Sequence, residues 1–205
     1  MKQKNTPLKK RECGPCKACC EVLKIDVPEL KKKAHVLCRF HTGTGCGIYE
    51  TRPPVCQHFL CGWRLFAELD DGWRPDLSGA LIVRREAADV AKDYRDAPYG
   101  LSIGIIGGEE TMTRPGFAEF VVGEIAKGIP VEIRSNSPGT LLNHHLVDIK
   151  AAARDMEATR ASLARIFGMI RAARWKRGPL MLWHLYRLEV ARQTALMEKR
   201  LSKNS

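Results

Sequence analysis

The chain has 205 residues, of which 44% are hydrophobic and 28% are charged. This length suits one well-packed domain with a smaller appended module, and the composition excludes a wholly disordered chain. No run approaches the roughly 18 to 20 apolar residues that a membrane span requires. The basic N-terminal segment leads into no apolar stretch, so it does not resemble a secretory signal. We expect a cytoplasmic protein without a membrane segment.

The net charge of +11 is concentrated near the N-terminus. Residues 1–64 hold 13 Lys and Arg against 5 Asp and Glu, a net charge of +8, and residues 65–205 hold 21 against 18, a net charge of +3. Such a basic segment can bind nucleic acid. Alternatively, its cations offset ionised cysteines in the same stretch. The coincidence of cations and cysteines favours the second interpretation.

All the cysteines lie within residues 13–61, and none occurs in the 144 residues that follow. There are eight: Cys13, Cys16, Cys19, Cys20, Cys38, Cys46, Cys56 and Cys61. A disulfide framework needs an oxidising compartment, which nothing in the sequence indicates. Inert core cysteines would not cluster in this way. Metal binding therefore explains the pattern best, and all eight are candidate metal ligands.

The run "CGPCKACC" at residues 13–20 repeats the C-x2-C spacing, in which two thiolates can turn back onto one ion. It ends in an adjacent pair, Cys19 and Cys20, whose side chains diverge in a strand and lie about 100° apart in a helix. The pair therefore serves two sites, bridges two ions, or leaves one thiol free for redox chemistry. Four thiolates complete one zinc site or one iron–sulfur cluster, so eight are enough for two centres.

The later cysteines lie in a segment with little regular periodicity. Glycines flank Cys46 and let the backbone fold closely around a metal. The "RPP" run at residues 52–54 forces an extended or turning path before Cys56. We expect residues 12–64 to form a loop-rich module that metal holds together in place of a hydrophobic core.

This cysteine-rich segment resembles the CxxCxxCC cysteine-cluster family, which is described as a zinc- or iron-chelating domain. The same signature occurs in flagellin lysine N-methylases. The resemblance covers residues 12–64 and includes all eight cysteines. It also includes an "IY..RP..C..F" pattern, here Ile48, Tyr49, Arg52, Pro53, Cys56 and Phe59. It implies a metal site and no settled reaction. Residues 65–205 contain no Gly-rich strand–helix loop that offers an S-adenosylmethionine site.

Other side chains near the cysteines have weaker claims to function. His35, His41 and His58 can join a mixed Cys/His site, but with eight thiols present we expect them at the surface or hydrogen-bonded to sulfur. The aromatic residues of the segment can stack on single-stranded nucleic acid. Packing of the module against its neighbour is the commoner role.

The middle of the chain, residues 65–140, predicts a small mixed α/β layer. Strands are expected at 80–85, 101–108 and 131–134, helices at 87–97 and 113–130, and a turn at 135–139. For the second helix, Thr113 is the expected N-cap, Pro115 suits the first turn, and Gly128 is the expected stop.

From residue 141 the sequence becomes helical. An alanine-rich helix is expected over 146–175 and a second amphipathic helix over 179–201, joined by a short turn into an antiparallel hairpin. The predicted fold class is therefore α+β. It consists of a cysteine module at 12–64, packed on a mixed α/β region at 65–140, and C-terminal helices at 141–201.

Three functions compete. The first is a metal-binding protein with a zinc or iron centre, including an iron–sulfur cluster. The second is a zinc-stabilised basic adaptor for nucleic acid or protein. The third is a protein-modifying enzyme such as a lysine N-methylase, which rests on the resemblance alone. No catalytic motif such as HExxH or GxSxG is present, so no catalytic residue is predicted.

Overall fold

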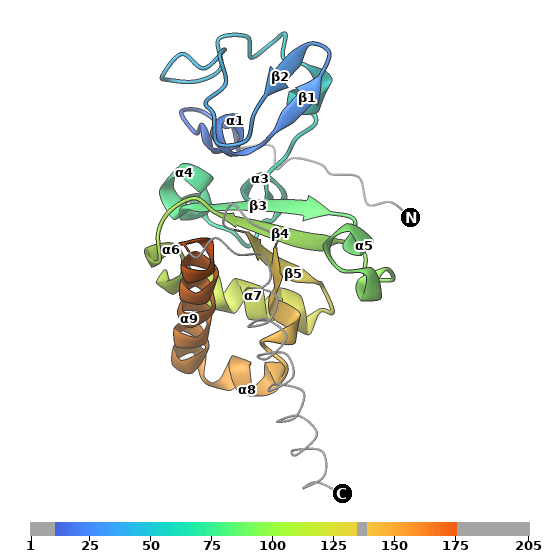
Figure 1. Cartoon of the computed structure of the whole chain (residues 1–205), viewed down its shortest axis with the longest axis vertical. Helices are drawn as coiled ribbons and strands as arrows, with labels where there is room; N and C mark the ends of the chain where they lie inside the picture. Colours follow the sequence, from blue (N-terminus) through green and yellow to red (C-terminus); the bar gives the residue numbers. More distant parts are fainter. Residues whose placement is uncertain (1–10, 135–138, 176–205) are drawn as a thin grey trace, which may run out of the picture.

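A four-stranded mixed sheet forms the middle layer of the molecule (Figure 1). The computed structural model describes residues 11–134 and 139–175. Within these ranges the sheet has the order β3 (Ala80–Arg85), β4 (Gly100–Ile105), β5 (Val131–Arg134) and β6 (Thr140–Leu141). β4 and β5 are parallel, and the two outer pairs are antiparallel. The central register places Ile82, Ile103 and Ile133 side by side, and all three are buried.

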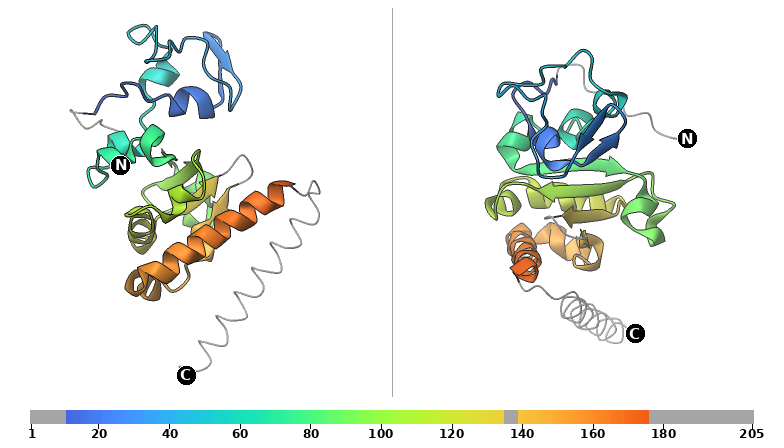
Figure 2. Two further views of the ribbon diagram at one scale, coloured as in Figure 1. Left: turned by 90° about the vertical axis from the view of Figure 1, so that its left-hand side faces the viewer. Right: turned by 45° about the horizontal axis from the view of Figure 1, so that its top comes forward.

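Helices cover one face of this sheet (Figures 1 and 2). They are α6 (Glu110–Thr113), α7 (Phe117–Ala126), α8 (Ile149–Arg154) and α9 (Met156–Trp175). Fully buried side chains of the sheet, such as Ile103, and of the helices, such as Phe117 and Leu163, join one hydrophobic core. This burial of apolar area is the main stabilising contribution to the layer.

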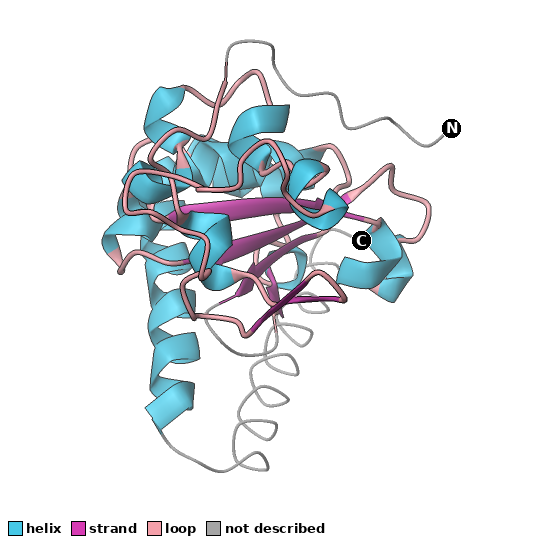
Figure 3. Ribbon diagram, turned by 90° about the horizontal axis from the view of Figure 1, so that it is seen from above, coloured by secondary structure: helices cyan, strands magenta, loops and turns pink. Residues whose placement is uncertain are grey.

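Residues 12–64, called the cysteine segment below, lie on the side of the sheet opposite to these helices (Figure 1; Figure 2, right). Its elements are short: α1 (Ala18–Val22), a hairpin of β1 (Ile25–Val27) and β2 (Leu30–Lys32), α2 (Pro54–Gln57) and α3 (Gly62–Leu65). The turns η1 (Asp71–Trp73) and α4 (Pro75–Ser78) follow before β3. Viewed from above, loops occupy much of this segment (Figure 3).

The cysteine segment contacts the sheet through α3. Cys61 forms an isolated antiparallel bridge with Val83 of β3. A Cβ at Gly62 would lie 2.6 Å from Cγ2 of Ile82, closer than such atoms approach one another, so this contact requires glycine. Cys61, Trp63 and Ala18 also belong to the main core. The cysteine segment and the sheet therefore share one hydrophobic core.

The α+β class expected from the sequence is confirmed. The strands at 80–85 and 131–134 form as predicted. The strand predicted at 101–108 is β4, which begins one residue earlier, at Gly100, and ends three residues earlier, at Ile105. The predicted helix at 87–97 is wrong in its extent: only α5 (Ala87–Val90) and the 3-10 turn η2 (Lys92–Tyr94) form. The predicted turn at 135–139 lies outside the described residues except for its last position, and the second helix of the hairpin at 179–201 lies wholly outside them.

The two longer helix predictions need correction. The predicted helix at 113–130 is wrong in its extent: α7 covers only Phe117–Ala126. The predicted N-cap is also wrong, because Thr113 ends α6 and the N-cap of α7 is Gly116, in a left-handed conformation (φ 84°). Gly128 follows the end of α7 with φ 80°, as expected of a helix stop. The predicted helix at 146–175 divides at Asp155, between α8 and α9. Of the described helices, none is both long and apolar enough to cross a membrane.

Candidate metal centre

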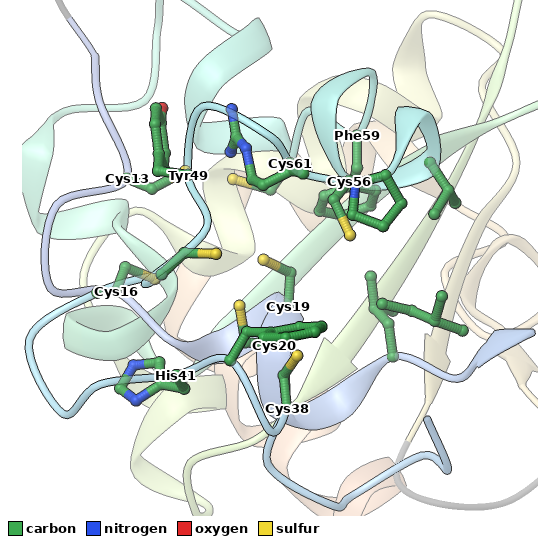
Figure 4. Close-up of a pocket in the computed structure, with 18 of the residues that line it drawn as sticks. Cys13, Cys16, Cys19, Cys20, Cys38, His41, Tyr49, Cys56, Phe59 and Cys61 are labelled. Atoms are coloured by element: carbon green, nitrogen blue, oxygen red, sulfur yellow. The ribbon is translucent and has the colours of Figure 1, made fainter. Parts of the chain in front are cut away.

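All eight cysteines line one cavity of about 140 Å³ inside the cysteine segment. Figure 4 shows Cys19, Cys20 and Cys38 on one side of this space and Cys56 and Cys61 on the other. None of the eight is in a disulfide. Residues up to 48 positions apart in the sequence are thus brought to one place, as the cysteine pattern predicts. We call this space the cysteine cavity.

The first four cysteines are placed by a turn and a helix. The amide of Cys16 donates to the carbonyl of Cys13 at 3.0 Å, and Gly14 between them has a φ of 51°, which glycine adopts without strain. This closes the first C-x2-C unit into a tight turn. α1 then begins at Ala18 and carries the adjacent pair Cys19 and Cys20.

The middle cysteines are placed by a loop that returns to α1. The amide of Cys38 donates to the carbonyl of Cys20 at 3.0 Å, and the amide of His41 donates to the carbonyl of Cys38 at 3.0 Å. His41 and Cys46 then pair as an isolated antiparallel bridge. The loop from 38 to 46 is therefore folded back on itself and held against the end of α1.

The last two cysteines are placed by short helices. Cys56 lies in α2, whose first residue is Pro54. Cys61 is the N-cap residue of α3. Burial raises the pKa of the Cys61 thiol, and the backbone amides of Arg64 and Trp63 partly offset this by favouring the thiolate. Amides directed at sulfur in this way are typical of cysteines that hold metal.

Arg64 ties the first cysteine to α3. Its Nη1 donates to Sγ of Cys13 at 3.9 Å, and its Nε donates to the carbonyl of Arg11 at 2.9 Å. Arg11 in turn donates to the carbonyls of Trp63, Phe66 and Leu69. The chain before Cys13 is therefore fixed to the turn that follows Cys61.

A buried lysine lies beside the cysteine cavity. Lys32 is only 7% exposed, and its ammonium donates to the carbonyls of Glu21, Lys33 and Val36 at 2.8 to 2.9 Å. None of these three partners is a carboxylate. Burial lowers the pKa of Lys32, and the nearby thiols of Cys38, Cys20 and Cys19 act against that lowering. The thiols, more strongly than the Glu21 carboxylate, are thus the anionic groups near this buried charge.

The thiols differ in acidity. Burial raises the pKa of Cys16 to about 11. The hydrogen bond that Cys19 donates to Cys20, with burial, raises the pKa of Cys19. The same bond lowers the pKa of Cys20 to about 7, assisted by the cations Lys32 and Arg52. Cys20 is therefore the thiol most readily ionised near neutral pH among those with a resolved shift.

Three buried nitrogen atoms of cavity-lining residues lack a hydrogen-bond partner within the described residues: Nε2 of His41, Nε of Arg52 and Nε1 of Trp63. His41 accepts a hydrogen bond at Nδ1 from the amide of Gly43 at 3.0 Å, so in the neutral ring Nε2 carries the proton. All three atoms are then donors. Leaving such donors unpaired is costly, and sulfur anions are suitable acceptors for them.

The donor set fits a thiophilic metal such as zinc or iron by its chemistry. The side chains do not, however, define a coordination polyhedron. In the part of the chain that the structure describes, no three His, Cys, Asp or Glu side chains form a group arranged to hold a metal ion. The sulfurs line the wall of a cavity and do not converge on one point.

The histidines fall in three different environments. His41 lines the cysteine cavity, and its Nε2 donor has no partner among the described residues. His58 is exposed and does not line the cavity. His35 lines a second cavity of about 550 Å³ between α1 and the ends of β3 and β4. Pro75 lines both cavities.

Sequence reasoning missed the polar residues around the cysteines. Lys32 and Arg64 were counted only as parts of the basic segment, and Asp76, which accepts a hydrogen bond from the Cys16 thiol, lies outside residues 12–64. Asp76 also accepts from Arg74 at 2.7 and 3.0 Å. No local motif marks these residues, because strand pairing and packing bring them to the thiols.

Comparisons of this chain with protein-family models, curated proteins and solved structures find no match. Its function is therefore inferred from the cysteine cavity and the residues around it.

Proposed function

We propose that this chain binds zinc or iron through the thiolates of its eight cysteines, in the reducing environment of the cytoplasm. The observation that carries the proposal is the single cavity lined by every cysteine of the chain. Zinc and iron–sulfur centres are the groups that protein thiolates hold. Bound metal would also stabilise a segment whose helices and strands are only three to five residues long.

The charges near the cavity support this proposal over nucleic-acid binding. Lys32 is buried with its charge next to thiols, Arg64 donates to Cys13, and Arg52 interacts with Cys20 and Cys56. These cations act inside the segment and do not form a surface for phosphates. They account for part of the net charge of residues 1–64 by charge compensation.

The resemblance to the CxxCxxCC family agrees with this proposal, because that family's signature is the same set of eight cysteines. It does not extend the proposal to lysine methylation. Shared modules do not transfer an activity, and residues 65–205 offer no recognisable cofactor motif.

The test is anaerobic purification of the full chain followed by metal and sulfide analysis and an absorption spectrum. A coloured protein with iron and acid-labile sulfide indicates an iron–sulfur centre, and a colourless protein with zinc indicates zinc. A variant with all eight cysteines changed to serine is the control for adventitious metal. If the native chain holds no more metal than this control, and still takes up none when iron, sulfide or zinc is supplied, the proposal is wrong.

A further inference from the structure

We propose that the eight cysteines form two neighbouring four-thiolate centres and not one eight-thiolate assembly, an inference that rests on the metal binding proposed above. The first group is Cys13, Cys16, Cys19 and Cys61, and the second group is Cys20, Cys38, Cys46 and Cys56. The adjacent pair on α1 supplies one ligand to each group.

Contacts around Arg64 hold the first group together. Cys13 and Cys16 share the turn closed by their 3.0 Å backbone hydrogen bond. Arg64, three residues after Cys61, donates to the Cys13 sulfur, which brings the two ends of the cysteine segment together. After Cys20, to which its thiol donates, the groups that act most strongly on Cys19 are Cys13 and Cys16, and Cys13 is the thiol that acts on Cys61.

The second group is held together by the loop that returns to α1. Backbone hydrogen bonds join Cys20 to Cys38 and Cys38 to His41, and the His41–Cys46 bridge extends the chain of contacts. The thiols that act most strongly on Cys56 are Cys20, Cys38 and Cys46. The backbone contacts therefore place Cys38 and Cys46 with Cys20, and the electrostatic neighbours of Cys56 add it to this group.

The helix explains why the adjacent pair divides between the groups. Successive side chains on a helix point about 100° apart, so Cys19 and Cys20 on α1 face different directions. They are still close enough for the Cys19 thiol to donate to the Cys20 sulfur. Two centres supplied by this pair would consequently be neighbours within one cavity.

The two groups differ in electrostatic surroundings. The second group has the cations Lys32 and Arg52 nearby. The first group has Arg64, and next to Cys16 it has the carboxylate of Asp76, which is itself paired with Arg74. Four thiols that bind one Zn²⁺ release four protons and leave a centre of charge −2. This negative charge is better compensated in the second group, so the second centre fills first.

Cobalt(II), added to the anaerobic full chain as a spectroscopic substitute for zinc, tests the division. Each titration is read after equilibration with a competing chelator. A site that keeps only three thiolates binds cobalt more weakly, so the chelator empties it and the site is counted as lost. The native chain should take up two equivalents. The single variants Cys13→Ser and Cys38→Ser should each take up one. Because its two changes fall in one group, Cys13→Ser/Cys61→Ser should also take up one, whereas Cys13→Ser/Cys38→Ser should take up none.

Other results have distinct meanings. A native chain that binds neither cobalt nor iron refutes the proposed function itself. Two equivalents in the native chain, with Cys13→Ser/Cys61→Ser losing both or Cys13→Ser/Cys38→Ser retaining one, overturns the division while metal binding stands.

A measurement on the native chain avoids variants that fail to fold. Partial removal of cobalt by chelator, followed by alkylation and peptide mapping, should expose the thiols of the first group together while those of the second stay protected. Simultaneous exposure of all eight, or exposure in other combinations, contradicts the two-centre division.

Discussion

Nη1 of Arg64 lies 3.9 Å from Sγ of Cys13, and these residues are 51 positions apart in the chain. The contact closes the cysteine segment on itself, because the same guanidinium also donates to the carbonyl of Arg11. A positively charged donor at the sulfur forms a charge-assisted hydrogen bond with a metal-bound thiolate and holds its side chain in place. Arg64 is therefore a positioning residue for the first group.

Changing Arg64 to Gln should weaken metal binding at the first group by about tenfold, as loss of an outer hydrogen bond to a metal ligand typically does. Chelator competition of the loaded protein measures this. The exposed Arg39, which stacks on Phe40 with 4.8 Å between the guanidinium and the ring centroid, provides the control Arg39→Gln. Equal metal affinity in the two variants would show that the contact with Cys13 has no role.

A corresponding effect on metal affinity is expected for Lys32 and the second group. Lys32→Met removes the buried charge beside Cys20 and Cys38, and metal affinity at the second group should fall about tenfold. The neighbouring Lys31, exposed on the same strand, gives the control Lys31→Met. Denaturant unfolding of the metal-free variants separates this effect from loss of the three carbonyl hydrogen bonds. A Lys32→Met protein with native metal affinity would contradict the prediction.

The sequence predicts the cysteines of the site, but it does not predict the roles of Arg64 and Lys32. The cysteines are found from their spacing because a C-x2-C unit forms locally. Lys32, by contrast, lies within the run of lysines at 31–33, and nothing in that run singles it out. It is buried because the β1–β2 hairpin turns alternate residues inward, with Leu30 and Lys32 buried and Lys31 exposed.

The sequence likewise predicts some elements of the fold and not others. Strands at 80–85 and 131–134 follow from short apolar runs bounded by turn residues. The break between α8 and α9 does not follow from periodicity, because the alanine-rich sequence continues through it. Asp155 causes the break by capping α9: its carboxylate accepts from the amide of Ala158 at 2.9 Å. Whether the chain forms one continuous helix or breaks at a capping residue depends on tertiary packing. The periodicity of the sequence carries no information about that packing.

Arg11 should contribute to stability independently of metal. Its guanidinium donates to three carbonyls after Cys61 and lies over the Trp63 ring, with 5.6 Å to the centroid. Arg11→Ala leaves partly buried carbonyls without donors, and we expect the free energy of unfolding to fall by about 2 to 3 kcal/mol. Urea unfolding of the metal-free protein measures the loss. The exposed Lys33 gives the control Lys33→Ala, and equal stability of the two variants would refute the role of Arg11.

Cys20 should be the most reactive of the thiols with shifted acidity in the metal-free protein. The hydrogen bond from Cys19 lowers its pKa from 9.0 to about 7, so its thiolate forms as the pH rises through about 7. Alkylation at a series of pH values, read by peptide mapping, should show Cys20 reacting at lower pH than Cys16. Cys19→Ala removes the donor and should move the reaction of Cys20 to higher pH. An unchanged profile in that variant would contradict the assigned cause.

Asp76 is expected to oppose metal binding, and its removal should strengthen the first group. Burial raises the pKa of Cys16 to about 11, together with the charge of the Asp76 carboxylate and the hydrogen bond that this carboxylate accepts from the thiol. Asp76→Asn removes the charge and keeps the backbone amide that favours the thiolate. Cys16 should then ionise at lower pH, and metal should bind the first group severalfold more tightly at neutral pH.

Alkylation of the metal-free protein and chelator competition of the loaded protein measure the two effects separately. The exposed Asp71, 3.8 Å from Nε of Arg11, gives the control Asp71→Asn. Asp76 also pairs with Arg74, so the variant's unfolding is measured as well. Weaker metal binding in a stably folded Asp76→Asn protein would mean that the carboxylate orients Cys16 for the metal and does not hold it protonated.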